Sequence, residues 1–309
     1  GCTSIQPSAE QTAMSTVSGV ATAGPTPGQG ATVQAAGATG PAGESNSPAA
    51  AARPLIDSRT APAAGRLDPA VLDAALQSVR TRHRAQVSVA WGPVGRPDLV
   101  QAVGSTPDIE AWSTLKVPIA LAVSQAADGK PSASASRLMR LSLTLSDNDA
   151  AVALWRSLGS EPDKRVREVL VATGDPSTHP ARDAAGRPIA FGLTPWQLTD
   201  SARFAALLPC APDASPVLAF MGGITPEHAW GLGTVAGTRF KGGWGPSPHG
   251  YFARQLGLVP RADGRTAAVA LAAQPQDGTH ESAAAALDEA TKVLVSLLHA
   301  DDGGTCPSS

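Results

Sequence analysis

The chain has 309 residues, which suffices for one large domain and an additional segment. Its formal net charge of −2 gives no electrostatic reason to expect nucleic acid or an anionic membrane surface as a partner. Apolar residues make up 42% of the chain, enough for a substantial core, but no run of about 18 apolar residues predicts a membrane-spanning helix.

The first 53 residues predict a lipid-anchored tether. A small residue, then Cys2, then a polar tail is typical of a bacterial lipoprotein after its signal has been removed, although a cysteine could also stand there by chance. Residues 3–52 contain only Glu10 and Glu44 as charged residues and no aromatic residue, so they cannot bury enough apolar surface to fold. We expect an extracytoplasmic domain held through Cys2 at the outer face of the cell membrane.

The folded part is expected over residues 54–300, as an α+β domain. A helix over 67–83 precedes a strand pair, a block of helices, three further strands and a final helix. The strands are predicted at 86–91, 98–104, 238–243, 251–259 and 266–274. The helices between and after them are predicted at 113–127, 137–144, 149–158, 164–173, 195–208 and 282–299. The helix over 195–208 should begin with Thr194 as cap and Pro195 in its first turn.

This order predicts one five-stranded antiparallel sheet packed by the terminal helices, with a separate, short all-helical lobe. A cleft between two such lobes is a common place for an active site. Residues 301–309 are expected as a tail.

Cys210 and Cys306 are the cysteines that remain if Cys2 is lipidated. In an oxidising compartment a disulfide between them would hold the tail to the domain. The alternative is two unrelated thiols.

The first candidate motif is Ser113-Thr114-Leu115-Lys116. Residues three apart share a helix face, so Lys116 could take the proton that makes the Ser113 hydroxyl a nucleophile. A dry, cationic surrounding would lower the pKa of Lys116 enough for this. By itself the motif is equally consistent with a helix cap and a solvated lysine.

Two further motifs follow in the chain. Ser146-Asp147-Asn148 lies in a loop between helices and offers a second hydroxyl and an amide, although such residues also cap helices, which is our interpretation of Asp147. Lys241-Gly242-Gly243-Trp244 lies on a predicted strand, where glycines mark close approach by a ligand or by another backbone. A simple β-bulge is the alternative.

Together, and in this order, the three motifs resemble those of the serine β-lactamases and penicillin-binding DD-peptidases, above all class A. The resemblance covers residues 66–300 and implies an acyl-enzyme mechanism without a metal or cofactor. Ser113 would be the acylated nucleophile, Lys116 its base and Ser146 a proton shuttle. Asn148 would bind the substrate amide, and Lys241 would supply positive charge near the substrate carboxylate. The backbone N–H groups of Ser113 and Trp244 would bind the oxyanion, beside Gly243.

The sequence departs from this family in three places. Gly242 replaces the Thr or Ser whose hydroxyl binds the substrate carboxylate, a loss of about 1.5–3 kcal/mol. Residues 174–193 contain no Glu to drive deacylation, only Asp175 and Asp183. Ser146 follows Ser113 by 33 positions, fewer than in class A enzymes.

Two functions therefore remain open. One is an envelope hydrolase of non-standard specificity, such as an esterase or amidase, with little or no β-lactamase activity. The other is a catalytically inactive binding or scaffolding lipoprotein on the same fold, in which a side chain such as Trp244 fills the oxyanion position. In either case we expect a monomer that meets the membrane through its lipid, with a cell-wall or other acyl compound as the possible substrate.

Overall fold

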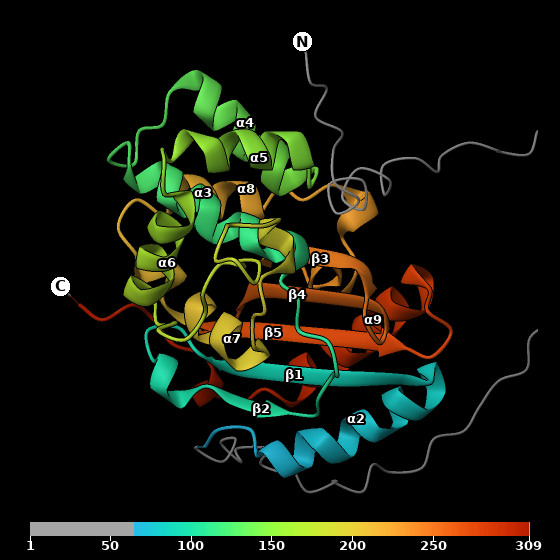
Figure 1. Ribbon diagram of the computed structural model, residues 1–309. Helices are drawn as coiled ribbons and strands as arrows, with labels where there is room; N and C mark the ends of the chain where they lie inside the picture. The colour runs from blue at the N-terminus through green and yellow to red at the C-terminus, as the bar shows by residue number, and fades with distance from the viewer. Residues whose placement is uncertain (1–64, 309) are drawn as a thin grey trace, which may run out of the picture. The chain divides into compact units, whose positions relative to one another are not determined.

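The computed structural model describes residues 65–308 (Figure 1). Cys2, the expected tether over residues 1–53 and the expected start of the domain at residue 54 lie outside the described residues, so these predictions stay predictions.

The centre of the domain is a five-stranded antiparallel sheet with the strand order β2-β1-β5-β4-β3 (Figure 1). This confirms the predicted fold class. The strands are β1 (Ala85–Pro93), β2 (Gln101–Val103), β3 (Arg239–Ser247), β4 (Gly250–Pro260) and β5 (Thr266–Pro275). β2 is shorter than predicted because Pro97–Leu99 forms a 3-10 turn, which takes residues 97–99 out of the strand.

The first and last helices cover one face of the sheet (Figure 1). α2 (Pro69–His83) begins with Asp68 as its cap, and α9 (His280–Leu297) begins with Thr279, whose hydroxyl accepts from the N–H of Ser282. Their apolar stripes pack on the alternating apolar side chains of β1, β4 and β5, and this contact forms the main hydrophobic core. Burial of each large apolar side chain there contributes about 1.5–3 kcal/mol.

The middle of the chain forms the helical part on the other face of the sheet (Figure 1). α7 lies directly on β1 and β5. Within residues 65–308 no single helix is long and apolar enough to cross a membrane, and only the segments Leu198–Cys210 and Ser215–Met221, bent by 119°, reach that composition as a pair. The helices are α3 (Lys116–Gln125), α4 (Ala133–Thr144), α5 (Asn148–Ser157), α6 (Pro162–Ala172), α7 (Leu198–Leu207) and α8 (Ser215–Met221), of which α8 was not predicted.

The predicted start of α7 is wrong. The Thr194 hydroxyl accepts from the N–H of Ala181 instead of capping the helix, and Pro195 pairs with Glu110 in an antiparallel bridge. The backbone is therefore still extended at these residues, and the helix begins at Leu198. A Thr-Pro pair is a helix-start signal only where its hydroxyl is not already used by a neighbouring loop.

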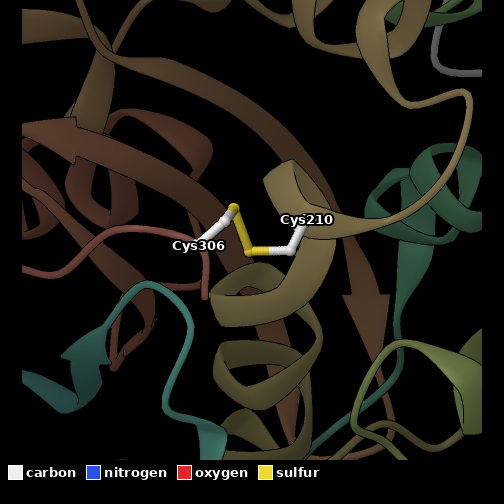
Figure 2. Close-up of a disulfide and its surroundings, with 2 residues drawn as sticks. All are labelled: Cys210 and Cys306. Carbon is white, nitrogen blue, oxygen red and sulfur yellow. A yellow bond between two sulfur atoms is a disulfide. The ribbon is translucent and has the colours of Figure 1, made fainter. Parts of the chain in front are cut away.

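The predicted disulfide between Cys210 and Cys306 is confirmed (Figure 2). It joins the short turn after α7 to the C-terminal segment across 96 residues of chain. This segment is held by more than the disulfide, because the carboxylate of the wholly buried Asp302 accepts from the Trp91 indole and from the N–H of Leu67. Gly304 also pairs with Thr266. Residues 301–304 are thus part of the packed domain and not a loose tail.

Candidate active site

Ser113 and Lys116 start from the same side of one helical turn. A 3-10 turn, Trp112–Leu115, leads directly into α3, and the N–H of Lys116 donates to the carbonyl of Ser113. In a 3-10 turn residues three apart eclipse one another, so the two side chains leave the backbone on one side. The sequence predicted a single α-helix from residue 113, whereas the structure tightens its first turn.

Lys116 is wholly buried, and its amine is held by the Ser146-Asp147-Asn148 loop. Its Nζ donates to the carbonyl of Ser146 over 2.6 Å and to Oδ1 of Asn148 over 2.7 Å, and it lies 3.3 Å from Oγ of Ser146. Burial lowers the pKa of Lys116 to about 7, against the attraction of the Asp147 charge. A good part of this amine is therefore neutral near pH 7, as a proton acceptor requires.

Ser146 joins the two motif lysines. Its Oγ accepts from Nζ of Lys241 over 3.0 Å, on the other side from Lys116. Ser146 also has a φ of 55°, a left-handed conformation that non-glycine residues seldom adopt and that costs about 1–3 kcal/mol. Asp147 caps α5 by accepting from the N–H of Ala150, as we interpreted it from the sequence.

Lys241 lies on β3 and is almost completely buried. Its amine also donates to the carbonyl of Gly242 over 2.8 Å. Burial, followed by repulsion from Lys116, holds the pKa of Lys241 well below its usual range. Two amines that share one hydroxyl thus each favour the neutral state of the other.

Gly243 allows β3 to lie directly against the turn that carries Ser113. A Cβ at this position would come within 2.7 Å of the Ser113 backbone nitrogen and 2.8 Å of the Ala111 carbonyl oxygen. At Gly245 a Cβ would meet the ring of Trp112 at 2.6 Å. Because β3 is an edge strand, alternate N–H groups along it do not pair within the sheet and can face a ligand. This is the arrangement that an oxyanion site between Ser113 and β3 needs.

The Ser113 hydroxyl is not part of the lysine network. Among the hydrogen bonds of residues 65–308, those of the Lys116 amine go to Ser146 and Asn148, and none joins it to Oγ of Ser113. The structure thus brings all the predicted motifs together, but it leaves the nucleophile outside their hydrogen bonds.

The other side of β3 carries an aromatic cluster that sequence reasoning missed. Trp244 packs against His228, Trp230 and His280, with ring centroids 4.7, 5.9 and 5.6 Å away, and Tyr251 contacts His280. We call these five residues the aromatic cluster. Burial lowers the pKa values of both histidines, that of His228 to about 4 with a further contribution from Lys241, so neither adds a positive charge near neutral pH.

Trp230 fills the space beside Gly242. A Cβ on Gly242 would lie 3.0 and 3.1 Å from two ring atoms of Trp230. The buried Gln255, directly opposite Gly242 on β4, donates to the Trp230 carbonyl over 2.7 Å and accepts from the N–H of Leu232 over 2.7 Å. At the position where the serine β-lactamases that the sequence resembles carry a hydroxyl, the side-chain space is therefore occupied by the Trp230 ring, which Gln255 of β4 holds in place.

The two carboxylates of residues 174–193 serve the fold. Asp175 is wholly buried and accepts from the Trp196 indole and from the N–H groups of Ser177 and Thr178. Asp183 closes a turn with Arg187. Neither lies in an arrangement typical of a general base. Within residues 65–308 no three His, Cys, Asp or Glu side chains converge as metal ligands would.

A buried arginine fixes the segment that leads to Ser113. Arg254 on β4 donates to the carbonyls of Ile109 and Trp196 and to the hydroxyl of Ser201. It has no ion pair among the described residues, and burial lowers its pKa to about 9, against the nearby charge of Glu110. No local pattern indicates this role, because the partners come from two segments that are distant from Arg254 in the chain.

No protein-family model and no curated protein matches the sequence. Among solved structures, a class A β-lactamase from Bacteroides cellulosilyticus is similar with a TM-score of 0.60 at 15% identity, covering 75% of this chain and 99% of that one. A class A β-lactamase from Mycobacterium abscessus gives 0.57 at 16%, covering 73% and 98%. TLA-3 extended-spectrum β-lactamase gives 0.58 at 14%, covering 74% and 98%.

The domain has the class A β-lactamase fold. At these identities the likeness establishes the fold alone, and activity and specificity have to be argued from the site itself.

Proposed function

We propose that this protein is a serine hydrolase that works through an acyl-enzyme and has little or no β-lactamase activity. The observation that carries the proposal is a pair of buried lysine amines that both contact Oγ of Ser146. One of the two, Lys116, lies one helical turn after Ser113. Two buried amines without an ion pair among residues 65–308 are costly to charge, and their lowered pKa values suit proton transfer.

In the proposed reaction Oγ of Ser113 attacks an ester or amide carbonyl carbon, and its proton passes to the neutral amine of Lys116. The oxyanion is stabilised by the backbone N–H groups of Ser113 and Trp244. The leaving group then takes the hydroxyl proton of Ser146, which Lys116 replaces, and the bond from the carbonyl carbon to the leaving group breaks. Water releases the acyl group by the reverse proton path. Asn148 would orient Lys116 and the substrate.

Poor β-lactamase activity follows from two features of the site. Gly242 supplies no hydroxyl for the carboxylate that penicillins carry. Asp175 and Asp183 are engaged in the fold, so no carboxylate of residues 174–193 is placed to activate the deacylating water.

The second candidate is a binding or scaffolding protein without turnover. The observation that favours it is that, within residues 65–308, the hydrogen bonds of the Lys116 amine go to Ser146 and Asn148, while the Ser113 hydroxyl takes no part in them. The Trp244 ring does not support it, because it packs in the aromatic cluster on the side of β3 that faces away from the Ser113 turn and so leaves the oxyanion position unfilled.

Intact-mass analysis separates the two candidates. The full chain carrying Cys2→Ser is incubated with a fluorophosphonate or with penicillin, and Ser113→Ala in the same background is the control. An adduct with the fluorophosphonate that requires Ser113, with little or none from penicillin, is expected. No adduct with either reagent would leave the binding protein as the function.

We also propose that the domain is a monomer, lipid-anchored at the outer face of the cell membrane, where cell-envelope acyl compounds would be its substrates. The sequence around Cys2 supports this proposal. Metabolic labelling with an alkynyl palmitate should mark the full chain and not its Cys2→Ala variant, and equal labelling of both would contradict the anchor.

A further inference from the structure

The aromatic cluster lies where the site would otherwise meet a substrate carboxylate. Gly242 and Trp244 are two positions apart on β3, so both point to the side of the cluster, while Lys241, which precedes Gly242, faces Ser146. The Lys241 amine nevertheless lies 5.9 Å from the centre of the Trp244 ring. The cluster therefore borders the proton-transfer network directly.

We propose that Trp230 is a specificity-determining residue, which excludes acyl donors that carry a carboxylate on the leaving group and selects neutral ones with an apolar or planar leaving group. This inference rests on the proposed function and names the substrate class of that site. The proposal says more than that residue 242 lacks a hydroxyl. Because the Trp230 ring occupies the space beside residue 242, adding a hydroxyl there would not by itself restore the binding of a carboxylate.

The charges around the cluster agree with a neutral ligand. The two lysine amines are held by Ser146, Asn148 and the Gly242 carbonyl, so their donors are largely used within the protein. Both cluster histidines are neutral near pH 7. A carboxylate entering here would lose its water without gaining a free cation, which is unfavourable.

The cluster also has unsatisfied polar atoms. The indole Nε1 of Trp230, a residue only 8% exposed, and Nδ1 of His228 are buried without a hydrogen-bond partner among the described residues. Buried polar atoms of this kind are nearly always paired in a working state of a protein. A donor on an indole and a nitrogen of a neutral imidazole can pair with an uncharged polar group, such as an ester or ether oxygen, on a ring that stacks on the cluster.

The test compares two acetate esters that carry a neutral or an anionic group at the same ring position, methyl 3-acetoxybenzoate and 3-acetoxybenzoate, each rate being divided by that of hydrolysis without protein. Their leaving phenols carry the methyl ester or the free carboxylate, and release of the phenol is followed for the full chain with Cys2→Ser. We expect kcat/KM for the neutral ester to exceed that for the anion by at least about tenfold, the factor that one hydrogen bond to a charged group represents. A ratio near one would overturn the proposal, and this result needs no variant to fold.

Three variants then separate a filled space from a missing hydroxyl. Gly242→Thr alone is expected to leave the anionic ester as poor as before, because its side chain collides with Trp230. Trp230→Ala together with Gly242→Thr is expected to lower the preference for the neutral ester at least about fivefold, and Trp230→Ala alone by less. Rescue of the anionic ester by Gly242→Thr alone would overturn the role of Trp230. Thermal unfolding identifies any variant that fails to fold, and Trp230→Leu with Gly242→Ser then replaces the double variant.

Binding of the two esters to the Ser113→Ala variant tests this inference separately from the proposed function. Quenching of tryptophan fluorescence by the two esters reports on the cluster without any chemistry. If neither ester acylates Ser113 in the unmodified site, the proposed hydrolase fails. The inference still stands if the neutral ester alone quenches, and it fails if both esters quench equally or neither does.

Discussion

Strand β3 has two sides that are built differently. On the side that faces the Ser113 turn, Gly243 and Gly245 allow the strand to lie close to that turn, and Lys241 reaches Ser146. On the other side, Gly242 and Trp244 meet the aromatic cluster. The first side has the groups that the proposed acyl transfer needs. The second side has the Trp230 ring at residue 242, where the serine β-lactamases that the sequence resembles carry a hydroxyl.

The two sides of β3 indicate that the proposed catalytic network and the proposed substrate subsite depend on different contacts, so that one can differ between proteins while the other stays the same. The network depends on backbone proximity, which glycine permits, and on two buried amines. The subsite depends on a ring that comes from another loop and is held by Gln255. The experiments below ask whether the two sides are as separate as the structure indicates.

The largest effect is expected on the side of the network. Lys116→Met keeps much of the side-chain volume and removes the proton acceptor, so fluorophosphonate labelling of Ser113 should slow by about 10²–10⁴-fold, the usual contribution of a general base. Labelling is followed by intact mass, with thermal unfolding to verify the fold. A loss of less than about threefold would exclude Lys116 as the base.

The next prediction compares one added methyl group on each side of β3. Gly243→Ala places its Cβ against backbone atoms of Ser113 and Ala111, which cannot move without shifting the nucleophile, so labelling should fall by about 10²-fold. Overpacking should also lower the free energy of unfolding by about 1–3 kcal/mol.

Gly242→Ala is the matched control. Its Cβ meets the Trp230 ring at 3.0 Å and Cγ of Gln255 at an ordinary 3.7 Å, so a small movement of the ring relieves the close contact. We expect a stability loss of about 1 kcal/mol and labelling within about threefold of the unmodified rate. Equal effects of the two substitutions on labelling would mean that the sides of β3 are coupled.

The pH dependence of labelling tests the state of Lys116. Its pKa is lowered to about 7, and only the neutral amine accepts a proton, so the rate should rise about tenfold per pH unit below 7 and level off above it. The charge of Asp147 raises the pKa of Lys116 against the effect of burial, and His228 is already neutral at pH 7. The rate is measured from pH 5 to 9. The same rise in Lys116→Met would assign the titration to another group.

The sequence predicted the fold because its signals are local. Alternation of apolar residues predicted the five strands, and spacing predicted the terminal helices, with errors only at their ends. That the three motifs meet was implied by their resemblance to the serine β-lactamases, since no motif by itself indicates a contact with the other two. Cys210 and Cys306 were paired by elimination.

The features that the sequence did not predict depend on contacts between distant segments, which no local pattern indicates. The members of the aromatic cluster come from residues 228–230, β3, β4 and the start of α9, so their meeting follows only from the packed fold. The same holds for Arg254 and for Asp302. The left-handed φ values of Ser146 and Trp112, 55° and 46°, are tertiary effects as well, since neither residue favours that conformation.

The smallest effect is expected at the far end of β3, away from both sides compared above. There the hydroxyl of Ser247 donates to Glu110 over 2.9 Å and accepts from the Trp112 indole over 3.3 Å, so it links the strand end to the segment before Ser113. Ser247→Ala removes both bonds and should lower the free energy of unfolding by about 1 kcal/mol, measured with a chemical denaturant. Ser247→Thr keeps the hydroxyl and should restore most of it. Labelling of Ser113 should change by less than about threefold, because Gly243 and Arg254 still fix that turn from nearer positions. If labelling instead fell tenfold while stability stayed constant, the geometry of Ser113 would be set from this end of the strand, and the backbone contact at Gly243 would be its consequence and not its cause.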